Sequence, residues 1–105
     1  GMVGTVREDK ANRTVEIGYW LDKNANGRGI MTRAVERVQD LAFEVGGADR
    51  IEIRCATENR ASRAIPERLN FNLDGILRRA EVLPGGIVHD IAVYSKLRQE
   101  WQKGK

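Results

Sequence analysis

Residues 14–56 limit the possible folds of this chain more tightly than any other segment, because they predict a strand, a helix and a second strand in direct succession. Residues 14–21 (TVEIGYWL) and 50–56 (RIEIRCA) alternate apolar with polar side chains, which is the period-2 pattern of a strand. Between them, apolar residues from Met31 to Val45 recur at three- and four-residue steps, which predicts an amphipathic helix. A helix that connects two strands in this order makes a crossover, so we expect the strands to be parallel.

The rest of the chain predicts further strands and two short helical segments around this unit. We expect strands at 2–6, 71–82 and 87–95, a short helix at 59–69 and a helical turn within 96–105. Pro66 removes an N–H from the middle of the short helix, so we expect a kink or a late helix start there. Asn70 suits the left-handed position that ends a helix. Together these elements predict one α+β (mixed α/β) domain over residues 1–105.

The composition fits a globular domain. The 105 residues are 41% hydrophobic and 31% charged, and no apolar run is long enough to cross a bilayer, so we expect no membrane association. Cys55 is the only cysteine, so no internal disulfide is possible and we expect a reducing, cytoplasmic location. No spacing of histidine, cysteine and acidic residues matches a metal site. The net charge is +3, but the scattered arginines and few aromatic residues argue against a nucleic-acid-binding domain.

The start of the predicted long helix is suited to bind an anion. Its first acidic residue is Glu36, so the free N–H groups and the positive dipole end stand beside Arg28 and Arg33 without a neutralising carboxylate. An ordinary tight turn with Asn26 as the helix cap explains the same residues. The pair Gly27 and Gly29 is weak evidence by itself, because the third glycine of the dinucleotide-binding fingerprint is missing.

Four segments together resemble the GNAT superfamily of N-acetyltransferases: EIGYWLDKNANGRGIMTRAV, RIEIRCATENRASRAIPERLNF, DGILRR and HDIAVYSKLRQEW. Their order over residues 14–101 is most similar to the RimJ/RimL-type branch, the ribosomal-protein and related amine acetyltransferases. The resemblance implies a GNAT-like mixed sheet with a crossover helix and two splayed strands, and acetyl-CoA in the cleft between those strands. Relative to the family the chain is N-terminally shortened, and we expect a homodimer that covers the edge of its first hairpin, within residues 2–21.

The same resemblance implies residues that bind acetyl-CoA. Backbone N–H groups of a glycine-marked loop would hold the pyrophosphate, and the end of the first confident strand would pair with the pantetheine arm. Gly18, at an expected bulge, would turn backbone donors towards the thioester. Asn59 would bind the pantetheine, although a plain helix cap explains it as well. The implied cofactor-binding residues are Tyr19, Trp20, Leu21, Gly27, Arg28, Gly29, Ile30, Met31, Thr32 and Asn59.

The catalytic residues are also implied by the resemblance. Many family members use a tyrosine to protonate the leaving thiolate where this chain has Pro66, so we expect the Ser62 hydroxyl to do so instead. An ordinary polar residue near a helix start explains Ser62 equally well. Attack by an amine also needs a base, for which we expect Glu52, with Glu16 as its rival. For either glutamate, an ordinary exposed strand carboxylate is the favoured explanation, and His89 and Tyr94 are further polar candidates.

The sequence therefore predicts an acetyl-CoA-dependent N-acetyltransferase that acts on a primary amine. The acceptor is left open between a protein N-terminus, a polyamine and another small amine. One alternative is a CoA-binding module that lacks a working acceptor site. A nucleic-acid-binding domain is less favoured, because only the positive net charge supports it.

Overall fold

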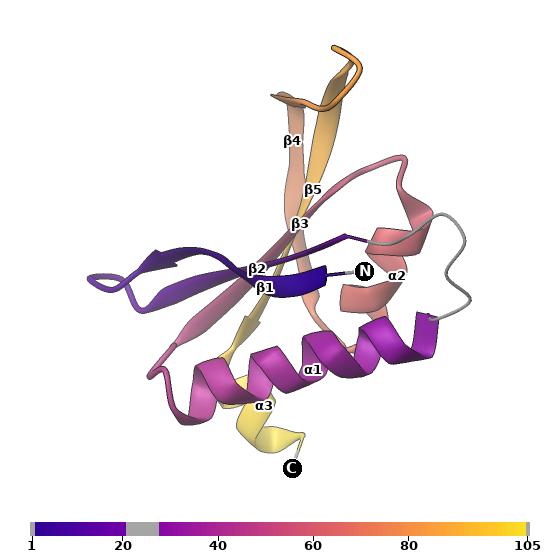
Figure 1. Cartoon of the computed structure of the whole chain (residues 1–105). Helices are drawn as coiled ribbons and strands as arrows, with labels where there is room; N and C mark the ends of the chain where they lie inside the picture. Colours follow the sequence, from indigo (N-terminus) through magenta and orange to yellow (C-terminus); the bar gives the residue numbers. More distant parts are fainter. Residues whose placement is uncertain (1, 21–27, 105) are drawn as a thin grey trace.

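The computed structural model describes residues 2–20 and 28–104 of the chain. The elements run in the order β1 (Met2–Asp9), β2 (Thr14–Trp20), α1 (Arg28–Glu44), β3 (Arg50–Ala56), α2 (Arg60–Arg68), β4 (Asn72–Val82), β5 (Val88–Leu97) and α3 (Arg98–Lys103) (Figure 1). The strands form one mixed sheet in the order β1-β2-β3-β5-β4. Strands β2 and β3 are parallel, as the crossover predicted, and the other pairs are antiparallel. This confirms the predicted α+β fold.

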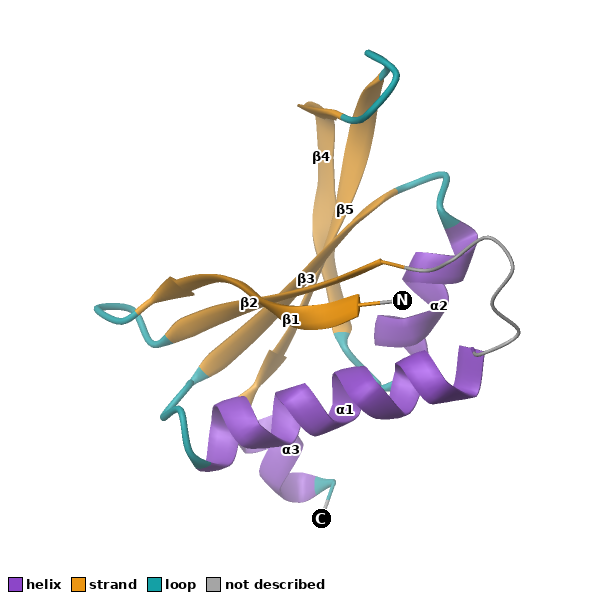
Figure 2. Ribbon diagram, in the orientation of Figure 1, coloured by secondary structure: helices purple, strands orange, loops and turns teal. Residues whose placement is uncertain are grey.

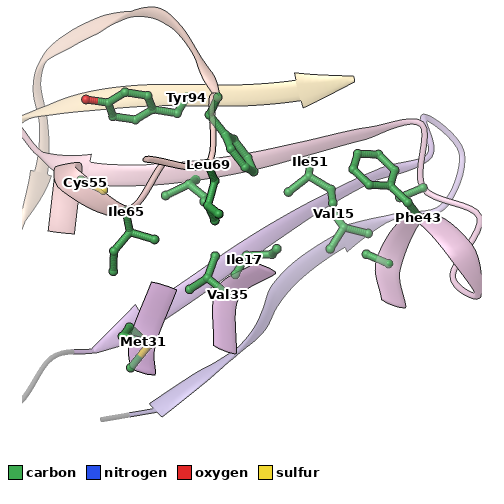
Figure 3. Close-up of a cluster of buried hydrophobic side chains, with 14 of the residues drawn as sticks. Val15, Ile17, Met31, Val35, Phe43, Ile51, Cys55, Ile65, Leu69 and Tyr94 are labelled. Atoms are coloured by element: carbon green, nitrogen blue, oxygen red, sulfur yellow. The ribbon is translucent and has the colours of Figure 1, made fainter. Parts of the chain in front are cut away.

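The helices α1, α2 and α3 pack on one face of the sheet and enclose the core there (Figure 2). The alternation in β2 and β3 decides which side chains enter that core. Val15, Ile17, Ile51 and Ile53 are buried, and they meet Val35 and Phe43 of α1 and Ile65 of α2 (Figure 3). Burying a large apolar side chain stabilises the fold by roughly 1.5–3 kcal/mol. The opposite face carries the polar residues of the same strands, among them Glu16, Glu52 and Arg54.

Helix α2 contains Pro66, yet it runs without a break from Arg60 to Arg68. Its N-cap is Asn59, whose side chain accepts a hydrogen bond from the Ser62 N–H at 3.0 Å. The helix therefore starts at its cap, so the late start, one of the two outcomes expected from Pro66, is wrong. The left-handed Asn70, with φ of 62°, follows the helix as predicted.

The N-terminal hairpin differs from the prediction in two ways. Strand β1 continues to Asp9, because Arg7, Glu8 and Asp9 pair with β2. The bulge predicted at Gly18 lies instead in β1, where Val6 is the extra residue between the paired Thr5 and Arg7. A Cβ atom on Gly18 would stand 2.1 Å from Cγ2 of Val6, so a larger residue at position 18 would require the Val6 side chain to shift.

The remaining elements follow the sequence closely. Gly85 and Gly86 have positive φ in the turn between β4 and β5, as the hairpin signal predicted. Helix α1 ends at Glu44, one residue earlier than expected, and Gly47 takes a φ of 70° in the following turn. The C-terminal segment forms α3, in which Trp101 stacks on Phe43 with ring centroids 5.0 Å apart. None of the helices in the described part of the chain is long and apolar enough to cross a membrane.

Strands β2 and β3 separate partway along their length. Their ladder joins Thr14–Glu16 to Arg50–Glu52 and goes no further within the described residues. Both strands then continue separately towards α2 (Figure 1). This confirms the splayed pair of strands that the resemblance implied, and it opens the sheet next to the first turn of α2.

Candidate functional site

A cavity of about 200 Å³ lies where β2 and β3 part. It joins three elements that are far apart in the sequence, namely the end of β2, the end of β3 and the start of α2, with the β4–β5 hairpin as a fourth wall. We call it the cleft. Its lining residues are Gly18, Tyr19, Arg54, Cys55, Ala56, Asn59, Ser62, Glu81, Leu83 and Ile91.

The cleft reaches both faces of the sheet. Cys55 belongs to the helix-covered core, whereas its neighbour Arg54 points to the opposite face because side chains alternate along a strand. Ile91 is paired with Ala56 and so shares the face of Arg54. The cleft is therefore lined by side chains from both faces of the sheet.

Tyr19 connects β2 to the first turn of α2 across the cleft. Its hydroxyl donates to the backbone carbonyl of Ser62 at 2.6 Å and lies 3.5 Å from Sγ of Cys55. Because the single phenol hydrogen is used by Ser62, the Cys55 thiol is the donor in the second contact. Burial raises the pKa of the Tyr19 phenol, and the nearby Cys55 raises it further. Tyr19 therefore remains neutral and serves as a hydrogen-bond donor.

Ser62 is half-buried and lines the cleft. No partner for its hydroxyl occurs among residues 2–20 and 28–104. Its backbone is held at both polar atoms, because Asn59 accepts from its N–H and Tyr19 donates to its carbonyl. Asn59 is thus the helix cap that the sequence allowed, and it also lines the cleft. The hydroxyl of Ser62 is left available to a bound molecule on a fixed backbone.

Helix α2 is held against the sheet by part-buried polar contacts. The hydroxyl of Tyr94, a residue only 1% exposed, donates to Glu67 Oε2 at 2.9 Å. The Tyr94 hydroxyl oxygen in turn accepts from Nε of Arg63 at 2.8 Å, and Arg63 also donates to the carbonyl of Thr57 at 3.2 Å. These contacts fix the helix that carries Ser62. Tyr94 itself lies in the core beside Cys55 and does not line the cleft (Figure 3).

The first turn of α1 carries no acidic side chain, as predicted. Gly29 is helical and exposed, and a Cβ atom on it would meet nothing within 4 Å. Ile30 is 73% exposed, whereas the side chain of Met31 is only 8% exposed and packs in the core. Thr32 is half-buried. Open backbone at the positive end of a 17-residue helix suits an anion such as a pyrophosphate.

Some predicted cofactor residues cannot be compared with the structure. Leu21 and Gly27 lie outside the described residues, and Arg28 is described only in its backbone. Trp20, at the end of β2, is 67% exposed. Of the predicted set, the cleft brings together Tyr19 and Asn59, with the predicted acid Ser62 between them.

Glu16 and Glu52 stand next to each other in the parallel ladder, on the face that the helices leave open. Arg50 donates to Oε2 of Glu52 at 2.7 Å, and Nε of Arg54 lies 3.6 Å from Oε1 of Glu52 and 4.0 Å from Oε1 of Glu16. Arg50 also binds Asp74 at 2.8 Å. The two predicted bases are thus brought together, but ion pairs hold them, and they stand beside the residues that line the cleft rather than among them.

The carboxylate that does line the cleft is Glu81 of β4. Sequence reasoning missed it, because the pattern of residues 71–82 predicts a strand without showing where that strand bends. Glu81 stands opposite His89 in the hairpin. The His89 side chain is only 16% exposed, and its Nδ1 lies 3.8 Å from a carboxylate oxygen of Glu58. The cleft therefore combines a hydroxyl, a carboxylate and the guanidinium of Arg54.

No group of three or more histidine, cysteine or acidic side chains that could hold a metal ion occurs in the described ranges.

Burial raises the pKa of the Cys55 thiol, although its hydrogen bond with Tyr19 opposes that effect. Cys55 is therefore protonated at neutral pH and is unsuited to act as a nucleophile.

The family model for the acetyltransferase (GNAT) domain matches residues 1–72. The chain is similar to YdaF of Bacillus subtilis (strain 168), with 39% identity over 105 residues, which are 100% of this chain and 57% of YdaF. It is similar to the structure of RimL, a ribosomal L7/L12 alpha-N-protein acetyltransferase, in complex with coenzyme A (TM-score 0.84, 31% identity, 93% of this chain, 55% of RimL). It is also similar to the microcin C7 self immunity acetyltransferase MccE in complex with acetyl-CoA and AMP (TM-score 0.75, 38% identity, 85% of this chain, 49% of MccE). The chain thus spans about half the length of these relatives.

Proposed function

Because this chain belongs to the GNAT acetyltransferase family, we propose that it transfers the acetyl group of acetyl-CoA to a primary amine, with a protein N-terminus as the favoured acceptor. The observation that carries the proposal is the cleft, which combines Ser62 and Glu81 at an opening between two splayed strands. The protein acceptor is supported by the similarity to RimL, whose name gives it a protein α-amine. Polyamines and other small amines are the competing acceptors.

The residues present fit acetyl-CoA, which would supply an acetyl group activated as a thioester. The acid-free first turn of α1 suits its pyrophosphate, with open space at Gly29 for close approach of the backbone. Among residues 2–20 and 28–104, no strand pairs with the end of β2 (Tyr19 and Trp20) on its β3 side, so backbone groups there are available to the pantetheine arm. Asn59, exposed at the cleft, offers a side-chain amide to the same arm.

Two proton transfers accompany the reaction. The acceptor arrives as an ammonium and must lose a proton before its nitrogen can attack the thioester carbonyl. We assign this proton to Glu81, since it is the carboxylate that lines the cleft, with Glu52 and Glu16 as the alternatives. The Ser62 hydroxyl then donates its proton to the sulfur that leaves. General acid or base catalysis of this kind contributes about 10²–10⁴-fold each.

Acetyl transfer is tested by incubating the chain with acetyl-CoA and a panel of amines, and by measuring acetylated product by mass spectrometry. The panel contains peptides with free N-termini, the same peptides with blocked N-termini, and polyamines. The proposal predicts a product with the free peptides that is absent from the blocked ones. Binding of acetyl-CoA without any product would favour the CoA-binding module, which the chain's half-length match to its relatives also allows.

The chain's assembly and location belong to the same proposal. Strand β1 stands at the edge of the sheet, and its residues 5–9 are exposed, so we propose that a second copy pairs there. Sedimentation at micromolar concentration should then give a dimer, and a folded monomer would remove this part of the proposal.

A single domain over residues 1–105 predicts one cooperative unfolding transition. The buried thiol of Cys55, without a disulfide, fits a cytoplasmic protein.

A further inference from the structure

The β4–β5 hairpin contains an irregularity next to the cleft. Leu77 is paired with Ile91, and the next pair is Glu81 with His89. Three residues of β4, at positions 78–80, therefore stand where β5 has only Asp90. This bulge adds two residues to β4 relative to a regular ladder, and it lies between the body of the sheet and the part of the hairpin that reaches the cleft.

Asp90 holds this bulge at its centre. Arg79 has a φ of 49°, a left-handed conformation that is unfavourable for a residue with a side chain. The backbone N–H of Arg79 donates to Oδ1 of Asp90 at 2.7 Å, the short distance of a hydrogen bond to a charged acceptor. The carbonyl of Asp90 accepts from the N–H of Thr57 at 3.0 Å. Asp90 is thus tied to the end of β3, and its carboxylate secures the strained residue in β4.

The bulge decides which charge faces the cleft. A regular antiparallel ladder continued from Leu77 and Ile91 would pair Arg79 with His89. The observed register instead pairs Glu81 with His89. The residue opposite His89 is Arg79 in the regular register and Glu81 in the observed one. Both would point to the same face of the sheet, because a shift of two residues preserves side-chain direction. Without the bulge, a guanidinium would replace the carboxylate at this wall, and an incoming ammonium would be repelled.

We propose that Asp90 is a positioning residue that selects the register of the hairpin, so that Glu81 rather than Arg79 lines the cleft. The consequence for acetyl transfer rests on the proposed function, because it matters only if Glu81 serves the acceptor amine. The selection of register does not depend on that function, and it can be measured in the protein alone.

The experiment measures whether a cysteine at position 89 forms its disulfide with a cysteine at position 79 or with one at position 81. In a Cys55→Ala background, Arg79→Cys, Glu81→Cys and His89→Cys are combined in one chain, and disulfides are equilibrated in a glutathione buffer. Directly opposed residues of an antiparallel pair lie within disulfide range. With Asp90 present, the 81–89 disulfide should exceed the 79–89 disulfide by about tenfold or more in peptide mapping, as expected for a charge-assisted hydrogen bond.

The same chain with Asp90→Ala should lose most of this preference. Asp90→Asn keeps an acceptor oxygen without the charge, so it should give an intermediate ratio, and it also answers the question if the alanine variant does not fold. Asp9→Ala is the matched control, because Asp9 accepts from the backbone N–H of Asn12 at 3.1 Å in the other hairpin. This control should leave the ratio unchanged.

An unchanged preference in both Asp90 variants would overturn the proposal, because the register would then be set elsewhere in the hairpin. The disulfide ratio tests the register of the hairpin independently of whether the proposed function is correct. If the ratio follows Asp90 but Glu81→Gln retains full acetyl transfer in the otherwise native chain, the assignment of the base fails and the role of Asp90 in register stands.

Discussion

The Tyr19 hydroxyl donates a hydrogen bond to the Ser62 carbonyl at the position that Pro66 leaves empty. In a regular helix this carbonyl would accept from the N–H of residue 66, which proline lacks. The 2.6 Å bond from Tyr19 satisfies it instead and explains why α2 continues through the proline. The end of β2 is thereby joined to the turn that carries Ser62.

We predict that Tyr19→Phe destabilises the fold by about 1–3 kcal/mol, the cost of leaving a carbonyl without a donor. The check is a double-mutant cycle with Pro66→Ala, measured by urea denaturation. Alanine restores an N–H to the helix, so Tyr19→Phe should cost markedly less in that background than in the native one. Additive effects of the two substitutions would show that Tyr19 does not replace the missing helical bond.

Ser62→Ala should leave the affinity for acetyl-CoA nearly unchanged and lower turnover by about 10²–10⁴-fold, because the lost proton transfer acts only in the transition state. Glu81→Gln should lower turnover similarly, with part of the loss recovered at high pH, where the acceptor amine is already neutral. Glu52→Gln and Glu16→Gln serve as comparisons in the same assay. A larger loss in either of these than in Glu81→Gln would move the base to that residue.

Two glycines should respond in opposite ways to an added side chain. Gly29→Val should weaken acetyl-CoA binding with little change in stability, because Gly29 is helical and its Cβ position is open. Gly18→Ala should destabilise the fold, because the new methyl group overlaps Val6. Melting temperatures with and without acetyl-CoA separate the two effects, since a ligand that binds only the folded state raises them. A normal ligand-induced shift in Gly29→Val would contradict the pyrophosphate assignment.

Asp74 should make stability fall in acid. Burial would raise its pKa, but hydrogen bonds from Arg50, Asn72 and Ser95 outweigh that effect and lower the pKa below the usual 3.8. A carboxyl with a lowered pKa contributes stability that is complete above pH 3.8 and is lost as the pH falls through its folded pKa. Asp74→Asn should flatten the stability curve below about pH 4, as measured by urea denaturation over a range of pH. The same acid dependence of stability in Asp74→Asn as in the native chain would contradict this assignment.

The parts of the fold that were predictable from sequence are those set by local periodicity and capping. The alternation around Ile17 and Ile53 and the cap at Asn59 depend on neighbours in the chain, and the structure confirms them. The close contact at position 18 comes from Val6 in another strand, and we infer that the position of Glu81 depends on the contact between Asp90 and Arg79. Such contacts between strands leave no periodic signal, so the splayed strands were expected only from the family resemblance, and Glu81 was not among the residues predicted for the site.

Binding of acetyl-CoA between the splayed strands and at the start of α1 can be measured by hydrogen–deuterium exchange with and without acetyl-CoA. We expect slower exchange on ligand binding in residues 18–20, 28–32 and 59–62, with the remote β1–β2 turn unchanged. In Gly29→Val this protection should be reduced throughout. Unchanged exchange in all three segments at saturating acetyl-CoA, with the chain folded, would show that acetyl-CoA does not bind at this site.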